Sequence, residues 1–362
     1  MNELRWDPLL KEWVIVAANR DKRPVLGKTF KDEASKKEAK SDLPSAQPKA
    51  LTEQSSSIKP AEKDPNYRCP FCPGSEEVKD ANWEVLQLGN RFSSLHSDLS
   101  VPWVESTSPD AIWPTKPALG KNEVILYTPE HYKHIGQLKI SNLERLTELW
   151  AQRYTYIAKD SLIKYIFIME NRGKEIGVSL EHPHGQIYCL PFLPPRIERE
   201  YNSVNEYKEK FEKCLYCEIM EKELKSGKRV ICQNDSFVAF VPYFTHFAYE
   251  IHMYAKKHIP SIADFDSKMT YDFARMLKEV VLRYDALKGG IMPYVMAQHN
   301  APSNVDKTEN WHFHVEFYTI FRGPERIKYL AGVELGCNTF VNDVFPEDAA
   351  ARLREVQIEK IE

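Results

Sequence analysis

The sequence predicts a fold of mixed helices and strands in which one unit occurs twice. Each half of the chain contains a Cys-x-x-Cys pair, then a strand-like run with Glu, Tyr and His at identical offsets, then a His-x-His segment. The same order of motifs at similar spacing indicates an internal duplication. These segments lie at Cys69–Cys72, Glu123–His131 and His182–Gln186 in the first half, and at Cys214–Cys217, Glu250–His258 and His312–His314 in the second.

Length and charge narrow the class of protein. A chain of 362 residues can bury a sizeable core and suits two domains or one large double domain. Its 49 Lys and Arg residues nearly balance 52 Asp and Glu residues, so it lacks the basic excess typical of nucleic-acid binding. The amino terminus has no apolar signal core, and no run is long and apolar enough to span a bilayer. We therefore expect a cytoplasmic protein without a membrane partner.

The amino-terminal region combines a strand-like run with basic residues. Glu12–Ala18 is followed by Arg20 and Arg23, whose guanidinium groups could bind a phosphate, although a solvated charged turn explains them equally well. From Gly27 to Asn66 the chain is rich in Lys, Glu, Ser, Pro and Ala. Such a segment buries too little apolar surface to order itself, so we predict a flexible insertion over residues 27–66.

The remaining elements follow the same order in both halves. Helical spacing of apolar residues predicts a helix from about Ser141 to Lys159, and a second from about Lys268 to Leu287. Strand-like runs precede or follow them at Glu123–Tyr127, Tyr165–Met169 and Met292–Ala297.

The two cysteine pairs predict metal sites. A Cys-x-x-Cys pair supplies two thiolates to a tetrahedral zinc, and two more ligands must come from elsewhere in the fold. The histidine after the strand and the first histidine of His-x-His are available in each half, which predicts two zinc ions per chain. Free buried cysteines are the alternative, and disulfides are less expected than either. The ligand sets are Cys69, Cys72, His131 and His182, and Cys214, Cys217, His258 and His312.

The segment His182-Pro183-His184-Gly185-Gln186 is the strongest candidate for chemistry. If it is extended, alternation places His182, His184 and Gln186 on one face, and that patch could hold a nucleophile. Pro183 and Gly185 suit a strand that faces a ligand better than a strand interior. The alternative is a loop with two structural histidines.

At these segments the chain resembles the galactose-1-phosphate uridylyltransferase family of the histidine triad superfamily, over nearly all of its length outside residues 27–66. The resemblance rests on the central His-Pro-His-Gly-Gln before Phe192-Leu193-Pro194, on Trp13–Val16 with Arg20 and Arg23, and on the second His-x-His before Phe317-Tyr318. It implies an α+β fold made of a duplicated histidine-triad-like domain, with antiparallel sheets flanked by helices. The halves would span residues 1–200 and 201–362, and the protein would be a homodimer.

The same resemblance implies a reaction and its residues. UMP would be exchanged between UDP-glucose and galactose 1-phosphate by a ping-pong route through a uridylyl-histidine, with UDP-sugar and hexose 1-phosphate as substrates. By position the nucleophile would be His184, and the residues that contact nucleotide or phosphates would be Arg20, Arg23, Asn90, Asn171, Ser179 and Gln186.

The chemistry of the residues agrees with this implication. A neutral imidazole can attack phosphorus if an acceptor holds its other ring nitrogen and so fixes the tautomer. A sugar phosphate leaves as a stable anion, so no acid is needed, and Gln186 can only donate hydrogen bonds to phosphoryl oxygens. This predicts transfer rather than hydrolysis. His182, as a zinc ligand, would fix the strand that carries His184.

Some positions depart from the family pattern. Some members have a second metal site of one Glu and three His; Glu200, His299 and His314 match it, but Glu316 replaces the last histidine. We favour the second cysteine set instead. Arg91 also replaces the usual acidic residue after the nucleotide-contacting asparagine. An ADP-sugar phosphorylase or adenylyltransferase, like a related plant branch with two cysteine pairs, is therefore an alternative, and a zinc-stabilised binding module without activity is a third.

Overall fold

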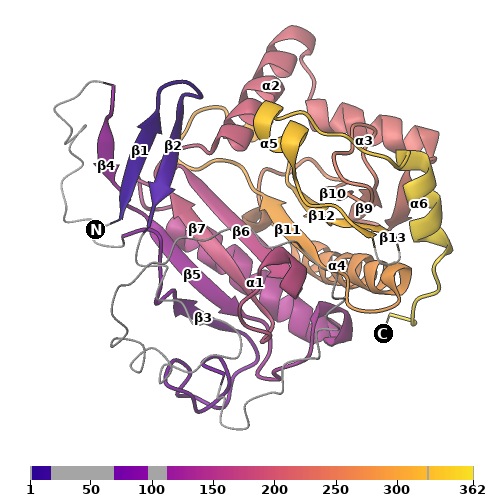
Figure 1. Ribbon diagram of the computed structural model, residues 1–362. Helices are drawn as coiled ribbons and strands as arrows, with labels where there is room; N and C mark the ends of the chain where they lie inside the picture. Colours follow the sequence, from indigo (N-terminus) through magenta and orange to yellow (C-terminus); the bar gives the residue numbers. More distant parts are fainter. Residues whose placement is uncertain (1, 18–68, 97–111, 324–325, 362) are drawn as a thin grey trace, which may run out of the picture.

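A computed structural model describes residues 2–17, 69–96, 112–323 and 326–361 of the chain. Within this part, nine strands form one sheet in which every pairing is antiparallel (Figure 1). The predicted α+β fold with antiparallel pairing is confirmed. In spatial order the strands are β3 (Leu86–Gly89), β5 (Lys121–Leu126), β7 (His184–Leu190), β6 (Tyr165–Arg172), β11 (Tyr294–His299), β12 (His314–Tyr318), β10 (Ile251–Ala255), β9 (Phe237–Phe240) and β8 (Val230–Gln233).

The order of strands shows how the repeated unit is arranged. From the centre outward it runs β6, β7, β5, β3 on one side and β11, β12, β10, β9 on the other, where β8 is added at the edge, so equivalent strands of the two halves stand at equivalent places. The halves meet where β6 pairs with β11, with Arg172 opposite Tyr294 and Ile168 opposite Gln298. Both halves therefore share one continuous sheet.

Two long helices cover one face of this sheet. Helix α1 (Ile140–Ile157) and helix α4 (Ser267–Lys288) lie side by side across the junction of the halves (Figure 1). Both buried stripes, which include Leu143 and Trp150 on α1 and Phe273 and Val280 on α4, belong to one hydrophobic core with inward residues of the strands. The predicted helices thus form within two residues of their expected ends.

The bounds of α4 follow from its terminal residues. The Asp266 side chain accepts a hydrogen bond from the Met269 amide at 2.8 Å, which satisfies one of the donors that a helix start leaves open. At the other end Gly289 adopts φ 72°, a left-handed conformation that glycine takes without strain and that stops the helix.

The opposite face of the sheet carries shorter elements. Helices α2 (Pro195–Phe211) and α3 (Leu215–Ser226) pack there with buried residues such as Tyr254 on β10 and Trp311, which precedes β12. A separate sheet joins β2 (Glu12–Val16), β1 (Glu3–Asp7) and β4 (Thr115–Pro117). Towards the carboxyl end lie β13 (Phe321–Gly323), β14 (Arg326–Ile327), α5 (Gly332–Cys337) and α6 (Pro346–Glu355).

Several boundaries differ from the sequence predictions. His182 and Pro183 precede β7, so of the three side chains expected on one strand face only His184 and Gln186 lie on the strand. Strand β11 starts two residues later than expected and ends two later, which brings His299 into the sheet. Arg20, Arg23 and the predicted insertion at 27–66 lie outside the described residues. No helix in the described ranges combines the length and apolar character needed to cross a membrane.

Candidate functional site

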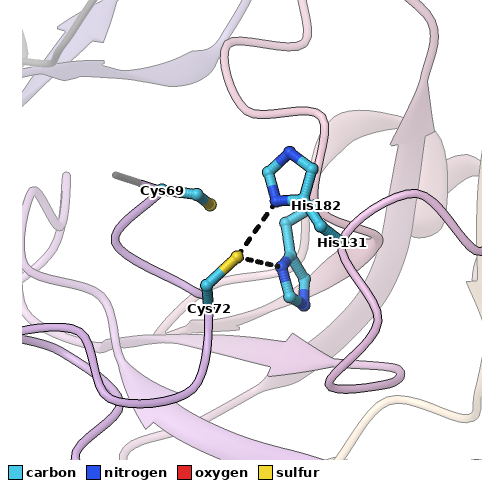
Figure 2. A group of neighbouring side chains, drawn as sticks. All are labelled: Cys69, Cys72, His131 and His182. Atoms are coloured by element: carbon cyan, nitrogen blue, oxygen red, sulfur yellow. Dashed lines mark hydrogen bonds between the residues drawn. The ribbon is translucent and has the colours of Figure 1, made fainter. Parts of the chain in front are cut away.

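The first predicted ligand set comes together at one end of β7. Cys69, Cys72, His131 and His182 place one potential ligand atom each within 4.8 Å of all the others (Figure 2). The Cys72 Sγ atom lies 3.1 Å from His131 Nδ1 and 3.7 Å from His182 Nδ1. The four side chains come from three separate stretches of chain, so an ion held between them would tie those stretches together.

A hydrogen bond fixes the His182 ring in a tautomer that can bind a metal. Its Nε2 lies 2.8 Å from the carbonyl oxygen of Thr128, which can only accept, so Nε2 carries the hydrogen and Nδ1 turns its lone pair towards Cys72. Burial lowers the pKa of His182 to about 4, which keeps the ring neutral as a metal ligand must be. Burial also raises the pKa of the Cys69 thiol to about 12, so a bound cation would have to stabilise its thiolate. This set of two sulfurs and two nitrogens fits zinc.

The second half repeats this arrangement. Cys214, Cys217, His258 and His312 also lie within 4.8 Å of one another by their ligand atoms. The Cys217 Sγ atom is 3.4 Å from His312 Nδ1 and 3.6 Å from His258 Nδ1. The Nε2 atoms of both histidines again donate to backbone carbonyls, those of Ala255 and Glu309, at 2.7 and 2.8 Å. The same tautomer is therefore fixed in both halves.

A third cluster combines one residue of helix α2 with two residues of strands β11 and β12. Glu200, His299 and His314 could hold a further ion; Glu200 Oε2 lies 2.9 Å from His299 Nδ1 and 4.0 Å from His314 Nε2. Glu316, which departs from the family pattern, is bound by Arg196 at 2.8 Å and lies 3.3 Å from His252 Nε2. The carboxylate and histidine cluster is thus separate from the second cysteine set, and neither replaces the other.

The candidate nucleophile, His184, is the first residue of β7 and is half-buried. Its Nδ1 lies 2.8 Å from the carbonyl oxygen of His182. Since that oxygen only accepts, Nδ1 is the protonated nitrogen and Nε2 carries the lone pair, the tautomer that nucleophilic attack requires. One wall beside the ring is Phe71, whose centroid lies 5.2 Å from that of His184.

Three hollows meet at His184. A cavity of about 510 Å³ extends from it past Asn171 to Arg172 and Lys288. A second hollow of about 150 Å³ is lined by Asn171, Ser179 and Gln186, and a third lies towards Asn90 and Phe92. The predicted substrate residues Asn90, Asn171, Ser179 and Gln186 therefore all border hollows that also include His184.

Gln186 lies on the same strand face, two residues beyond His184. Its Oε1 accepts a hydrogen bond from Asn90 Nδ2 at 3.5 Å, and Asn90 Nδ2 also donates to Asn122 Oδ1 at 2.6 Å. With Oε1 turned towards Asn90, the amide nitrogen keeps two donors for an anion beside His184. An orientation of this kind supports the binding of phosphoryl oxygens.

Gly185 faces the other side of β7. A side-chain methyl group here would collide with Tyr127 Oη and would lie 2.8 Å from the Met169 carbonyl oxygen. Strand β7 can therefore pack this closely on Tyr127 and β6 only because residue 185 is glycine.

Sequence reasoning missed a buried acidic residue beside the site. Glu170, at 4% exposure, borders the 510 Å³ cavity and accepts a hydrogen bond from Tyr294 Oη at 3.1 Å. Burial raises the pKa of its carboxyl to about 7. Next to it Arg172 forms two 2.8 Å hydrogen bonds with Asp285. The available signal was a charged pair, Glu170 and Arg172, at the end of an otherwise apolar strand.

Comparison with known proteins identifies the family. Residues 1–194 match the galactose-1-phosphate uridyl transferase N-terminal domain, and residues 200–361 match the C-terminal domain of the same family. The chain belongs to the galactose-1-phosphate uridylyltransferase family. The resemblance stated from the sequence motifs is confirmed.

Relatives within and near the galactose-1-phosphate uridylyltransferase family match over the whole length. The Thermotoga maritima galactose-1-phosphate uridylyltransferase is 36% identical over 99% of this chain and 100% of its own. A solved uridylyltransferase structure has a TM-score of 0.78, with 31% identity over 97% of each chain. The Arabidopsis thaliana ADP-glucose phosphorylase is 26% identical over 98% of this chain and 93% of its own.

Proposed function

We propose that this chain is a UDP-glucose–hexose-1-phosphate uridylyltransferase that exchanges UMP between UDP-glucose and galactose 1-phosphate. The observation that carries the proposal is the hydrogen bond from His184 Nδ1 to the His182 carbonyl, because it leaves Nε2 as the nucleophile beside Gln186. Membership of the family and the names of its full-length relatives support the same reaction.

The first half-reaction begins with attack of His184 Nε2 on the α-phosphorus of UDP-glucose. The bond from that phosphorus to the bridging oxygen breaks, and glucose 1-phosphate leaves with the electron pair as an anion. The hydrogen on Nδ1 stays with the His182 carbonyl, which stabilises the positive charge that the ring gains. Gln186 donates to the phosphoryl oxygens as their charge rises.

The second half-reaction reverses these steps with another acceptor. A phosphate oxygen of galactose 1-phosphate attacks the uridylyl phosphorus, the P–N bond breaks, and the neutral imidazole is restored as UDP-galactose leaves. No step requires a proton from a side chain, which agrees with an amide rather than an acid at residue 186. Asn171 and Ser179 border the hollow where the phosphates would lie.

We propose two zinc ions per chain in this enzyme, held by the two sets of cysteine and histidine ligands. Zinc there would supply structural cross-links; the first would hold the carbonyl of His182 in place for His184. We also propose a cytoplasmic homodimer whose chain divides into histidine-triad-like halves at 1–200 and 201–362. Arg20 and Arg23 remain predicted phosphate ligands.

A second candidate function is an ADP-sugar phosphorylase or adenylyltransferase. The observation that favours it is Arg91, which borders the hollow beside Asn90 where an acidic residue is usual, together with the second cysteine set. The chemistry at His184 would be unchanged, and only the base and the acceptor would differ.

Incubation with one substrate separates these functions. With UDP-glucose alone, we expect release of one glucose 1-phosphate per site and an acid-labile uridylyl group on His184. His184→Gly should abolish both while the protein keeps its zinc and fold. ADP-glucose with phosphate is the parallel assay for the second function. A uridylyl group on another residue, or full exchange activity in His184→Gly, would contradict the mechanism. If the protein reacts with neither UDP-glucose nor ADP-glucose, the binding module without activity is the remaining alternative.

A further inference from the structure

The third hollow beside His184 has features of a nucleoside site. His184 and Gln186 line it, and the rings of Phe71 and Phe92 border it with Val124. Flat apolar walls of this kind suit the faces of a base. Since the ribose is linked to the α-phosphate through only its 5′ carbon and oxygen, a nucleotide with its phosphorus at His184 must place its sugar close to His184, which lines this hollow.

Among the described residues, one carboxylate borders the hollow, that of Glu77, on the turn that follows the first cysteine pair. Arg91 faces it from the turn after Asn90, with its Nη1 3.9 Å from Glu77 Oε1. The same Nη1 lies 3.4 Å from Glu76 Oε1. The two acidic side chains differ in setting, because Glu77 is 21% exposed and lines the hollow, whereas Glu76 is 80% exposed and does not.

Arg91 offsets only part of the cost of removing the Glu77 carboxylate from water. Burial raises its pKa, and Arg91 at 3.9 Å lowers it by less, so the net shift is upward. A partly buried carboxylate in this position gains from additional hydrogen-bond donors. A ribose presents two hydroxyl donors on neighbouring carbons, which match the two oxygens of one carboxylate.

We propose that Glu77 determines specificity for ribose: its carboxylate accepts hydrogen bonds from the 2′ and 3′ hydroxyls of the bound nucleotide, and Arg91 holds it towards the hollow. The inference rests on the proposed function for the placement of the nucleotide at His184. It is independent of the base, because uridine and adenosine nucleotides share the ribose.

The test combines substrate analogues with variants. Release of glucose 1-phosphate is measured for wild type, Glu77→Gln and Glu76→Gln with UDP-glucose and with its 2′-deoxy and 3′-deoxy forms. Wild type should lose about tenfold to a hundredfold in kcat/KM with either deoxy substrate. In Glu77→Gln, kcat/KM for UDP-glucose should fall by a similar factor. The kcat/KM values of this variant for UDP-glucose and for the deoxy forms should then differ by less than about twofold. Glu76→Gln removes the other acidic partner of Arg91. It should keep the wild-type ratios of kcat/KM between UDP-glucose and the deoxy forms.

Two outcomes would overturn the proposal. One is wild type that uses the deoxy substrates as well as UDP-glucose, and the other is Glu77→Gln that keeps the full wild-type discrimination. The corresponding ADP-glucose series applies if the enzyme transfers adenylyl groups. If neither nucleotide sugar reacts, the proposed function fails, and calorimetric binding of UMP against 2′-deoxy-UMP to the same three proteins decides the role of Glu77 by the same ratios. Equal zinc content of the variants verifies that they fold.

Discussion

The imidazole of His184 donates its Nδ1 hydrogen to the main-chain oxygen of His182, 2.8 Å away, and the His182 ring turns towards Cys72. A predicted zinc ligand and the predicted nucleophile are thus joined through two residues of backbone. We expect His182→Ala to lower both zinc content and the rate of uridylyl-protein formation, because the carbonyl that fixes the His184 tautomer moves. His184→Gly is the matched control, with normal zinc and no adduct. Normal adduct formation by a zinc-depleted His182→Ala would contradict this coupling.

The repeated ligand sets offer a second comparison. Cys69→Ser and Cys214→Ser remove equivalent ligands from the two halves, and each should lower zinc from about two to about one per chain and the free energy of unfolding by about 3 kcal/mol or more. Only Cys69→Ser should also slow adduct formation, since only the first set adjoins His184. Metal analysis, chemical denaturation and single-turnover assays measure the three quantities. Unchanged stability in both variants would count against structural zinc.

Gly185 should tolerate no side chain. We expect Gly185→Ala to lower the free energy of unfolding by about 1–3 kcal/mol, because its methyl group would overlap Tyr127 Oη and the Met169 carbonyl. Tyr127→Phe should recover part of the loss, since Tyr127 Oη has no hydrogen-bond partner among the described residues. Gly323→Ala is the control, because a methyl group there would meet nothing within 4 Å. Equal losses from both alanine substitutions would show that the close packing is not the cause.

We expect Gln186 to stabilise the negative charge on the phosphoryl oxygens and not to change the nucleophile His184 itself. Gln186→Ala should still form the uridylyl adduct, but slower by about a hundredfold or more if its amide is the main phosphoryl donor. Rapid-quench measurement of the first half-reaction gives this rate. Asn90→Ala should produce a smaller effect, because Asn90 orients the Gln186 amide through a single 3.5 Å contact. A wild-type rate in Gln186→Ala would assign the phosphoryl contacts to other residues.

Glu170 should make stability fall as pH rises. Its carboxyl ionises near 4.5 when unfolded, but burial raises the folded pKa to about 7, so the native state binds more protons between these values. The free energy of unfolding should therefore decrease across this window, by up to about 3 kcal/mol from this residue. Glu170→Gln should remove that component, seen as a difference from wild type in denaturation at pH 5 and pH 8. Glu175→Gln, an exposed neighbour, should leave it in place; identical pH profiles of wild type and Glu170→Gln would contradict the prediction.

The sequence predicted the features that short motifs carry. The two ligand sets assemble as expected because each cysteine pair and each His-x-His segment is local, and the duplication indicated how the distant pieces correspond. The need for an acceptor behind His184 was also predictable from chemistry. The identity of that acceptor was not, since the direction of the His182 carbonyl depends on the backbone where β7 begins.

Features that depend on packing between segments remote in the sequence could not be predicted from it. The pairing of β6 with β11 joins strands from different halves, and no local pattern specifies such a partner. The burial of Glu170 and the approach of Arg91 to Glu77 depend likewise on segments that meet only in the folded protein. The end of β11 at His299 was missed because pairing with β12 extends the strand past its apolar residues.

The central pairing of β6 with β11 has a consequence for how the chain acquires its structure. As synthesis proceeds from the amino terminus, β6 is complete before the residues from Gly173 to Pro293 have been added, and its β11 partner follows only then. During that interval the first half exposes an open strand edge of mainly apolar residues, a template for pairing with other chains. Closing the sheet is a contact between remote parts of the sequence, which slows folding. Aggregation during expression should therefore depend on how quickly the second half is translated and docks.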